Sequence, residues 1–307
     1  MKEFELYRIL ICPECGGELS QLIEQNQSEE NSFLVCIKCN SRYSIEKNIP
    51  IMLIKDISDS EMNYIEHYEK DAELFDYFEQ RECKATEHEE RRVREYILSK
   101  IPSNAELILD VGSGGSWLSK NIDFDNHILI SLDLSEKNVL QSLNENSNKN
   151  HFGLVADALN PPFKENTIDC IIASEIIEHL INPEEFIKKM IKILKPGGKF
   201  IISTPYKEVI PYYLCIHCNQ MTPKNAHLHS FDEHKLSKYF NIIGNGFEEK
   251  IKFLIFGNKA LNILRTHVFL KYLPFSLWKF IDKISNLIIN KPAHIIVVYK
   301  KILTSKS

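Results

Sequence analysis

Short apolar runs alternate with mixed segments through the middle of the chain. Each run is an almost continuous stretch of hydrophobic residues, which is typical of a strand buried on both faces of a parallel sheet. The five runs occupy residues 107–111, 128–132, 152–156, 169–173 and 199–203. Because segments of helical length separate them, the pattern predicts an α/β fold with a doubly wound, mostly parallel sheet. Residues 249–256 and 294–301 predict a sixth and a seventh strand.

Hydrophobic residues recur at helical spacing between these last two strands. Residues 257–293 fit two amphipathic helices that are broken at Pro274, because proline cannot continue a helix. Residues 251–307 contain ten lysines or arginines and a single acidic residue, Asp282. Three interpretations stay open: the helices pack on the edge of the sheet, they cover a hydrophobic substrate, or they make a peripheral contact with a membrane surface.

The composition is that of an ordinary globular protein. Of the 307 residues, 44% are hydrophobic, which is enough for a sizeable core. The net charge of −5 argues against a general nucleic-acid binder. No apolar run of about 18 residues predicts a spanning helix, and residues 1–10 show no signal-peptide pattern. We therefore expect a cytoplasmic protein, in which paired cysteines indicate metal ligands rather than disulfides.

Two Cys-x-x-Cys pairs lie near the N-terminus, separated by twenty residues. Each pair is a tight turn that aims two thiolates at one point, and the four residues are Cys12, Cys15, Cys36 and Cys39. Four thiolates complete a tetrahedral site with no open position, which indicates a structural zinc. Residues 19–23 and 33–36 predict short strands beside it. We interpret residues 1–55 as a zinc ribbon that needs its metal to fold, because so small a unit has little core.

Acidic residues and glycines follow the predicted strands of the large sheet. Asp110 ends the first strand and is followed by Gly112 and Gly114, while Asp133 and Asp157 end the second and third runs. The carboxyl ends of parallel strands meet at one edge of the sheet, where glycines let backbone amides approach a ligand closely. A carboxylate after the second strand can accept hydrogen bonds from two ribose hydroxyls. The sequence therefore predicts a nucleoside site at this edge.

Together these features closely resemble class I S-adenosylmethionine-dependent methyltransferases over residues 88–206. The family pattern also has Leu-Lys-Pro-Gly-Gly before the fifth strand, which residues 194–198 supply. The resemblance implies a Rossmann-like seven-stranded fold with a final antiparallel hairpin, and S-adenosylmethionine as the cofactor. One departure is Ser116, where the family has a third glycine. The implied cofactor-binding residues are Asp110, Gly112, Gly114, Asp133, Leu134, Asp157, Ala158 and Glu175.

The same resemblance assigns roles within this set. Gly112 and Gly114 approach the methionine part of the cofactor, Asp133 holds the ribose, and Asp157 meets the adenine amine. The competing interpretation is an NAD-binding dehydrogenase, whose Gly-x-Gly-x-x-Gly motif grips a pyrophosphate. That motif fails here because position 117 is a tryptophan.

The segments that precede the methyltransferase-like region also follow a recognisable pattern. Residues 7–54, with Tyr43 and an Ile-Pro pair after it, resemble the small zinc-ribbon family that activates tRNA and other methyltransferases. The resemblance implies that the ribbon contacts the catalytic domain or the substrate. Residues 56–100 predict a helical linker, and residues 101–307 then form the methyltransferase domain. The linker either packs on the core or acts as a lid over the cofactor; its aromatic stripe comprises Tyr64, Tyr68, Phe75 and Phe78.

A first polar cluster follows the fourth strand. Glu175, Glu178 and His179 are three and four residues apart and would share a face of a helical turn. Two carboxylates and an imidazole could hold a divalent cation or provide a base. The pattern resembles the metal-binding Glu-x-x-Glu-His of ubiquinone-pathway O-methyltransferases and of small-RNA 2′-O-methyltransferases. It also occurs in family members without a metal, so both interpretations stay open.

A second polar cluster follows the fifth strand and offers the ligands of a second zinc: Cys215, Cys218, His227 and His229. The first alternative is a loop with two buried thiols and surface histidines. The second alternative sends His227 or His229 to the cluster around Glu175, as a further ligand or as a general base.

The sequence therefore predicts a methyltransferase that acts on an oxygen or nitrogen of a small, apolar acceptor. A hydroxyl acceptor would need a base, for which Glu178, His179 and His229 are candidates. One alternative is a tRNA or rRNA methyltransferase guided by the ribbon, although few basic residues cluster near the ribbon. The other is a non-catalytic scaffold that keeps cofactor binding. Neither the acceptor nor the oligomeric state can be read from the sequence.

Overall fold

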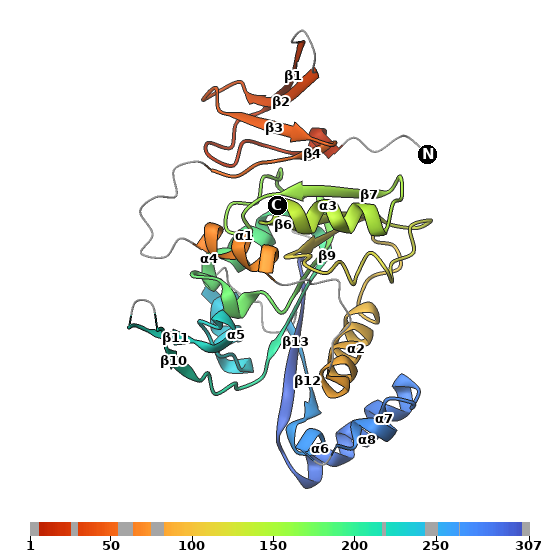
Figure 1. The fold of residues 1–307 in the computed structure, drawn as a ribbon. Helices are drawn as coiled ribbons and strands as arrows, with labels where there is room; N and C mark the ends of the chain where they lie inside the picture. Colours follow the sequence, from red (N-terminus) through yellow and green to blue (C-terminus); the bar gives the residue numbers. More distant parts are fainter. Residues whose placement is uncertain are drawn as a thin grey trace.

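A seven-stranded mixed sheet forms the centre of the molecule (Figure 1). The computed structural model describes residues 6–25, 30–54, 64–74, 83–216, 219–242, 251–263 and 265–302. The strand order is β12-β13-β9-β8-β5-β6-β7, which confirms the predicted Rossmann-like fold. The parallel strands are β5 (Leu107–Val111), β6 (Ile128–Asp133), β7 (His151–Val155), β8 (Ile168–Ser174) and β9 (Leu194–Pro205). An antiparallel hairpin of β12 (Ile251–Asn258) and β13 (Pro292–Lys300) completes the sheet beside β9.

Both faces of the sheet are covered, which explains the continuous apolar runs. Alternate residues of β5 belong to different core clusters, because successive side chains of a strand point to opposite faces. Leu109 packs with α4 (Pro183–Ile193) and α5 (Glu233–Ile242), whereas Ile108 packs with α2 (Lys84–Leu98). A fourth helix, α3 (Glu136–Glu145), joins β6 to β7 and packs against both strands.

Strand β9 begins earlier than the sequence indicated. The sequence placed residues 194–198 before a fifth strand that starts at residue 199. Instead β9 already pairs with β8 at Leu194, and the register shifts between that pair and the pair of Cys170 with Lys199. Gly197 has φ +86°, and a Cβ atom at Gly198 would lie 2.8 Å from the carbonyl oxygen of Asp169. The two glycines therefore permit a bulge within the strand rather than a turn before it.

The N-terminal unit is a four-stranded antiparallel sheet that caps the β7 side of the molecule (Figure 1). After η1 (Leu6–Ile9) it comprises β1 (Leu19–Gln25), β2 (Glu30–Cys36), β3 (Arg42–Glu46) and β4 (Ile49–Pro50). The amide of Met52 donates to the carbonyl of Val155 at 2.7 Å, and Leu10 bridges to Phe163. Leu10 and Met52 are 1% exposed and belong to the main core. The small sheet is therefore packed onto the large one and covers its edge strand.

Helices at both sides complete the fold. The linker contributes α1 (Tyr64–Leu74) and α2. After β9 comes a hairpin of β10 (Tyr212–Leu214) and β11 (Met221–Pro223), which is followed by η3 (Lys224–Ala226). The predicted insertion is present as α6 (Lys259–Ile263), α7 (His267–Leu270) and α8 (Phe275–Ile288). Its first half forms two short helices because Arg265 between them has φ +54°. No helix in the described parts of the chain has the length and apolarity to cross a membrane.

Candidate active site

The turn after β5 depends on glycines in the left-handed backbone conformation. Gly112 has φ +69° and Gly114 has φ +43°. A Cβ atom at Gly112 would lie 2.6 Å from Cδ1 of Ile176, so a side chain there would clash. The amide of Gly112 donates to the carbonyl of Leu132 at 2.8 Å, and the amide of Gly114 donates to Oδ2 of Asp133 at 2.8 Å. The turn is therefore tied to the end of β6.

Ser116 occupies the position of the third glycine without breaking the turn. It is fully buried and has φ +53°, a conformation that costs a non-glycine residue about 1–2 kcal/mol. Its hydroxyl hydrogen-bonds with those of Ser119, at 2.5 Å, and Ser142. Its amide donates to the carbonyl of Ser113 at 2.7 Å. These hydrogen bonds offset the strain, so the departure from the family pattern leaves the glycine turn intact.

Two carboxyl groups, one buried and one partly buried, lie beside this turn at the ends of β5 and β6. Asp110 is 2% exposed, and its Oδ2 has no hydrogen-bond partner among the described residues. Burial raises the pKa of Asp110 to about 7, and the charge of Asp133 adds to this shift. Burial also raises the pKa of Asp133, although its Oδ1 accepts the amide of Ser135 at 2.9 Å. Such a pair fits a ligand with positive charge and hydrogen-bond donors, as S-adenosylmethionine has.

A third acid, Asp157, follows β7 and is held by the linker. Its Oδ1 accepts the amide of Leu159 at 2.8 Å, and its Oδ2 accepts the hydroxyl of Tyr64 at 2.7 Å and the side-chain amide of Asn160 at 3.0 Å. Burial and the charge of Asp157 raise the pKa of Tyr64, so its hydroxyl stays protonated. Tyr64, the first residue of α1, thus contacts the acid that the resemblance assigns to adenine, a contact compatible with both the packing and the lid interpretations. Phe75 and Phe78 of the predicted stripe lie outside the described residues.

Two glutamates follow β8 in different conformations. We expected Glu175 and Glu178 to share a face of one helical turn with His179. Instead Glu175 lies before the short helix η2 (Ile177–His179), has φ +54°, and accepts the hydroxyl of Ser203 at 2.8 Å. Glu178 is 1% exposed and accepts the hydroxyl of Thr204 at 3.0 Å. Both carboxyl groups are therefore held by hydroxyls at the end of β9.

His227 completes a group with Glu178 and His179. Their potential ligand atoms all lie within 4.8 Å of one another, although the three residues come from two segments of the chain. The rings of His179 and His227 are 4.8 Å apart between centroids. Nδ1 of His227 lies 2.6 Å from Oε2 of Glu208, and the amide of Leu228 donates to the carbonyl of Glu178 at 2.7 Å. This arrangement corresponds to the alternative in which His227 joins the first polar cluster.

Burial sets the charge state of this group. It raises the pKa of Glu178 well above its usual range, with the charge of Glu175 as a second cause, and it raises the pKa of Glu175 to about 7. The pKa of His179 falls to about 4 through burial and the proximity of His227. His179 is therefore neutral near pH 7 and can accept a proton or bind a cation. Imidazole nitrogens beside carboxyl groups are a ligand set that suits a divalent metal.

The second predicted zinc site is only partly within the described residues. Cys215 follows β10, whereas Cys218 lies outside the described residues. His227 belongs to the group with Glu178, and His229 lies outside that group, with its ring 6.0 Å from the ring of Phe231. A zinc held by Cys215 and Cys218 therefore stays a prediction. His227, one of its predicted ligands, lies instead in the group with Glu178.

The four N-terminal cysteines converge on one point. The Sγ atom of Cys15 lies 3.4 Å from those of Cys36 and Cys39, and the Sγ atom of Cys12 lies 3.6 Å from that of Cys39. Zn–S bonds of about 2.3 Å in a tetrahedron would place the sulfur atoms about 3.8 Å apart. The hydroxyl of Tyr43 also lies 3.1 Å from the Sγ atom of Cys12. The geometry of the cluster fits a tetrahedral metal site.

Known proteins resemble the central part of this chain. Residues 109–202 match a family model described as a methyltransferase domain. This part of the chain is a class I S-adenosylmethionine-dependent methyltransferase domain. Ubiquinone biosynthesis O-methyltransferase of Rickettsia bellii is 31% identical over 147 residues, which cover 44% of this chain and 60% of that protein. The human mitochondrial protein of the same name is 29% identical over 156 residues, which cover 44% of this chain and 41% of that protein. The alignment thus spans less than two thirds of either relative.

Solved structures resemble the methyltransferase domain in fold alone. A phosphoethanolamine N-methyltransferase 2 of Haemonchus contortus has a TM-score of 0.47 and 15% identity, over 70% of this chain and 53% of that one. A complex of the Haloferax volcanii Trm112 methyltransferase activator with a methyltransferase contains a chain with a TM-score of 0.49 and 14% identity, over 78% of this chain and 99% of that one.

Sequence reasoning overlooked two kinds of residue around the methyltransferase site. Ser203 and Thr204 could have been noticed, because polar residues at the end of an otherwise apolar strand mark the ligand edge of a parallel sheet. Glu208, which contacts His227, lies in an irregular segment after β9 and carries no sequence signal. The structure alone brings it to the cluster.

Proposed function

We propose that this protein transfers a methyl group from S-adenosylmethionine to a hydroxyl oxygen of a small-molecule acceptor. The observation that carries the proposal is the glycine turn flanked by the buried carboxyl group of Asp110 and the partly buried carboxyl group of Asp133. The curated relatives are named O-methyltransferases of ubiquinone biosynthesis, which supports a small molecule and an oxygen nucleophile. Transfer to nitrogen is the closest alternative within the same reaction class.

The residues of the turn would hold the cofactor in a defined orientation. We assign the ribose to Asp133, the adenine amine to Asp157 and the methionine part to the turn of Gly112 and Gly114, with Asp110 compensating positive charge. Leu134, Ala158 and Glu175 would complete the contacts. When bound, the cofactor supplies an activated methyl group, so the protein contributes mainly orientation.

Methyl transfer to a hydroxyl also requires a proton acceptor. The acceptor oxygen attacks the methyl carbon, the carbon–sulfur bond breaks, and its electron pair stays on a now neutral sulfur. We assign the hydroxyl proton to His179, because its lowered pKa leaves it unprotonated near pH 7. Glu178 and His229 are the alternative bases, and neither is part of the glycine turn.

As the alternative to a base at His179, we propose that Glu178, His179 and His227 bind a divalent cation, in which case His179 acts as a ligand and not as the base. Support comes from the convergence of their ligand atoms and from the burial of Glu178, which is 1% exposed. A cation there would lower the pKa of an acceptor hydroxyl and fix its position. It would also explain why Glu178 sits in an environment that disfavours its charge.

The four-cysteine cluster is proposed to hold a structural zinc. Its thiolates leave no open ligand position, so we assign it no chemistry beyond folding the ribbon of residues 1–55. The division into this ribbon, a linker at residues 56–100 and a methyltransferase domain at residues 101–307 is part of the same proposal. A cytoplasmic location also stays a prediction.

The test follows labelled methyl groups into separated pools of a cell extract. Purified protein, methyl-labelled S-adenosylmethionine and a divalent metal are incubated with lipid, small-molecule, RNA and protein fractions. We expect label in the small-molecule or lipid fraction, whereas label in RNA would replace the acceptor class with a nucleic acid. Cofactor binding without label in any fraction would support the scaffold alternative.

A variant at the cation cluster sharpens the test. Glu178→Gln should abolish most transfer and metal binding while the affinity for S-adenosylmethionine is retained, because Glu178 is not part of the glycine turn. Glu165→Gln is the matched control, since Glu165 is exposed and forms a surface ion pair with Lys192 at 3.2 Å. Full transfer by Glu178→Gln would remove the cation cluster from the mechanism.

A further inference from the structure

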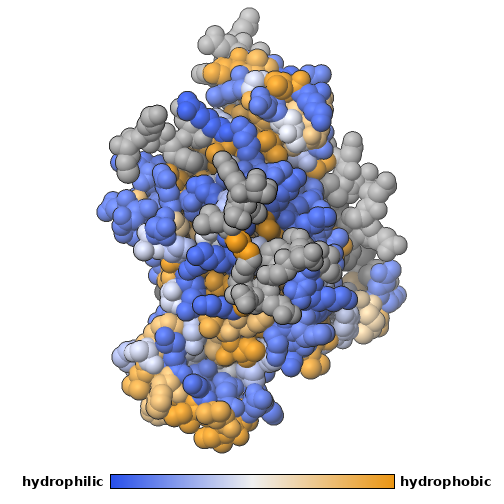
Figure 2. All heavy atoms as spheres, turned by 180° about the vertical axis from the view of Figure 1, so that it is seen from behind, coloured by the Kyte–Doolittle hydropathy of each residue, from blue (hydrophilic) through white to orange (hydrophobic). Residues whose placement is uncertain are grey.

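One face of α8 is apolar and open to solvent. Its hydrophobic side chains recur every three or four residues and are 40–78% exposed: Leu277, Phe280, Ile284, Leu287 and Ile288. Phe269 in α7 and Tyr272 after it are each 77% exposed. Figure 2 shows hydrophobic residues gathered over the lower end of the molecule, where Figure 1 places α6, α7 and α8. A large exposed apolar patch of this kind marks an interaction surface.

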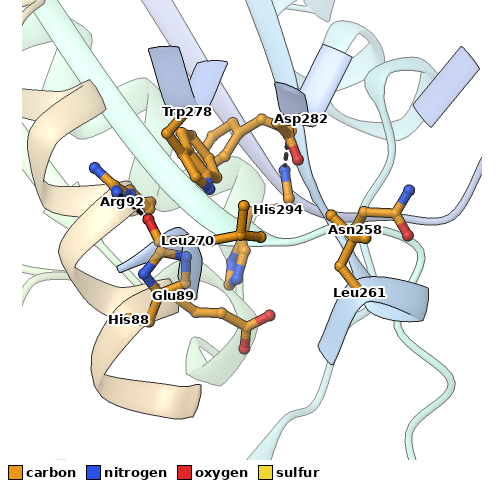
Figure 3. Close-up of a pocket in the computed structure, with 11 residues that line it drawn as sticks. His88, Glu89, Arg92, Asn258, Leu261, Leu270, Trp278, Asp282 and His294 are labelled. Atoms are coloured by element: carbon orange, nitrogen blue, oxygen red, sulfur yellow. Dashed lines mark hydrogen bonds between the residues drawn. The ribbon is translucent and has the colours of Figure 1, made fainter. Parts of the chain in front are cut away.

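The opposite face of α8 is anchored in the protein, so the exposure is built into the fold. Trp278 is 4% exposed, and the guanidinium carbon of Arg92 lies 5.0 Å from its ring centroid. Asp282 is 5% exposed and accepts the amide of Gly257 at 3.1 Å. Figure 3 shows Trp278 directed from α8 toward Arg92 of α2, and Asp282 with its hydrogen bond to the backbone of β12. Only about 20 Å³ of cavity remains between α8, α2 and β12, so the buried face of α8 is closely packed.

The turn between α7 and α8 is fixed by the same arginine. Nη2 of Arg92 donates to the carbonyls of Leu270 and Leu273, each at 2.9 Å, and Arg91 donates to the carbonyl of Lys271. The exposed aromatic residues of α7 are thereby held beside the apolar stripe of α8. The two helices present one preorganised surface.

Basic side chains border the apolar stripe along α8, whose own acidic residue is buried. Residues 251–307 contain ten lysines or arginines, and their single acidic residue is the buried Asp282. Lys279 and Lys283 lie on α8 one turn apart, next to the stripe, and both are exposed. Lysine stems can lie along apolar surface while their ammonium groups reach toward polar headgroups. An apolar stripe bordered by lysines is the pattern of a helix that lies in a membrane interface.

We propose that α7 and α8 dock on the surface of an anionic lipid bilayer. The apolar stripe would enter the boundary between headgroups and acyl chains, and the lysines would contact lipid phosphates. A second copy of this chain fits less well, because an isologous interface would bring together two patches that both carry positive charge. The proposal does not depend on the reaction that the protein catalyses.

The topology ties this surface to the ligand edge of the sheet. The insertion leaves the carboxyl end of β12 and returns at the start of β13, where His294 pairs with Pro205 at the carboxyl end of β9. The amide of Tyr206 also donates to the carbonyl of Ala293 at 2.8 Å. A bilayer bound to α8 would thus lie on the side of the sheet where the parallel strands end. If the proposed function holds, an acceptor dissolved in the bilayer would be close to the site.

Vesicle flotation of the full chain tests the docking. We expect the protein to float with phosphatidylcholine vesicles that contain phosphatidylglycerol, and to float much less with phosphatidylcholine alone. The double variant Phe280→Gln/Leu287→Gln should weaken flotation by about tenfold or more, because two exposed apolar side chains are lost. Lys283→Glu should weaken it at low salt and make little difference at high salt.

Matched controls separate docking from folding and from the reaction. Val209→Gln removes an apolar side chain that is 89% exposed elsewhere, and Lys188→Glu reverses an exposed charge on α4. Both controls should float like the wild type, and all variants should bind S-adenosylmethionine with unchanged affinity. Equal flotation of the double variant and the wild type, or no flotation with anionic vesicles, overturns the proposal. A dimer that the double variant converts to a monomer would replace the bilayer by a second copy.

Discussion

Replacing Asp133 by alanine should weaken S-adenosylmethionine binding by about two to four orders of magnitude. Each carboxylate oxygen of Asp133 accepts one backbone amide, from Ser135 at 2.9 Å and from Gly114 at 2.8 Å, and keeps capacity for a ligand donor. A hydrogen bond to a charged group contributes about 1.5–3 kcal/mol. Two ribose hydroxyls would therefore contribute about 3–6 kcal/mol, and each 1.4 kcal/mol corresponds to about tenfold in affinity.

The same substitution also removes an acceptor from the glycine turn. A conservative variant and a distant control separate this structural effect from the loss of ligand contacts. Asp133→Asn keeps one acceptor oxygen and should lose less affinity than Asp133→Ala. Asp169→Ala is the control, because Asp169 accepts the amide of Leu107 at 2.9 Å at the opposite edge of the sheet. It should lower the free energy of unfolding without changing the affinity for the cofactor.

Isothermal titration calorimetry with S-adenosylmethionine measures the affinity, and thermal unfolding without ligand measures the stability of each variant. The reasoning is refuted if Asp133→Ala retains the wild-type dissociation constant with an unchanged unfolding midpoint. In that case the cofactor does not bind at the end of β6. If Asp169→Ala loses as much affinity as Asp133→Ala, the effect reports general loosening of the sheet.

Three further predictions concern protonation, metal and packing. Burial raises the pKa of Asp110 to about 7. The protonated carboxyl therefore adds to the free energy of unfolding of the ligand-free protein at pH values below the pKa that Asp110 has in the unfolded chain, and this contribution is lost as the pH rises through about 7. A cationic cofactor favours the ionised form, so its affinity should rise over the same pH range, and calorimetry of Asp110→Asn should show a flatter pH dependence. Removing zinc with a chelator, or introducing Cys36→Ser, should increase hydrogen–deuterium exchange in the ribbon and also in residues 151–163, because backbone hydrogen bonds join the ribbon to this segment. Unchanged exchange of residues 151–163 would show that the ribbon folds independently. Met52→Ala should lower the free energy of unfolding in urea by about 2–5 kcal/mol, because Met52 is 1% exposed at this junction, whereas Ile23→Ala, at a side chain 52% exposed, should change it little.

The sequence predicted the parts of the fold that depend on local patterns. The five parallel strands were recognisable because both faces are buried, which demands continuous apolar runs such as residues 107–111. The acids at the ligand edge were recognisable because each stands where such a run ends. The early start of β9 was not, since a Pro-Gly-Gly sequence is compatible with a turn or with a bulge.

The cluster around Glu178 depends on contacts that no local pattern contains. His227 follows Glu178 by 49 residues, and its place is set by the path of the chain after β9 and by its contact with Glu208. The left-handed conformation of Glu175 was equally unpredictable, because it arises from the hydrogen bonds that β9 offers. The sequence could therefore supply the ligand types of this cluster, and His227 or His229 as alternative members, but not the choice between them.

The hydrogen bonds that Arg92 donates to the C-terminal insertion, and the ring contacts that Tyr96 makes with it, limit how the protein can be shortened. Arg92 is 1% exposed, and carbonyl groups about 180 residues further along the chain accept two of its hydrogen bonds. Deleting the insertion would remove these acceptors together with Trp278, whose ring centroid lies 5.0 Å from the guanidinium carbon, so the charge at position 92 would become solvated. The ring of Tyr96, which packs against Phe275 and Trp278, would lose its cover as well, so a shortened version of this protein needs a polar replacement for Tyr96.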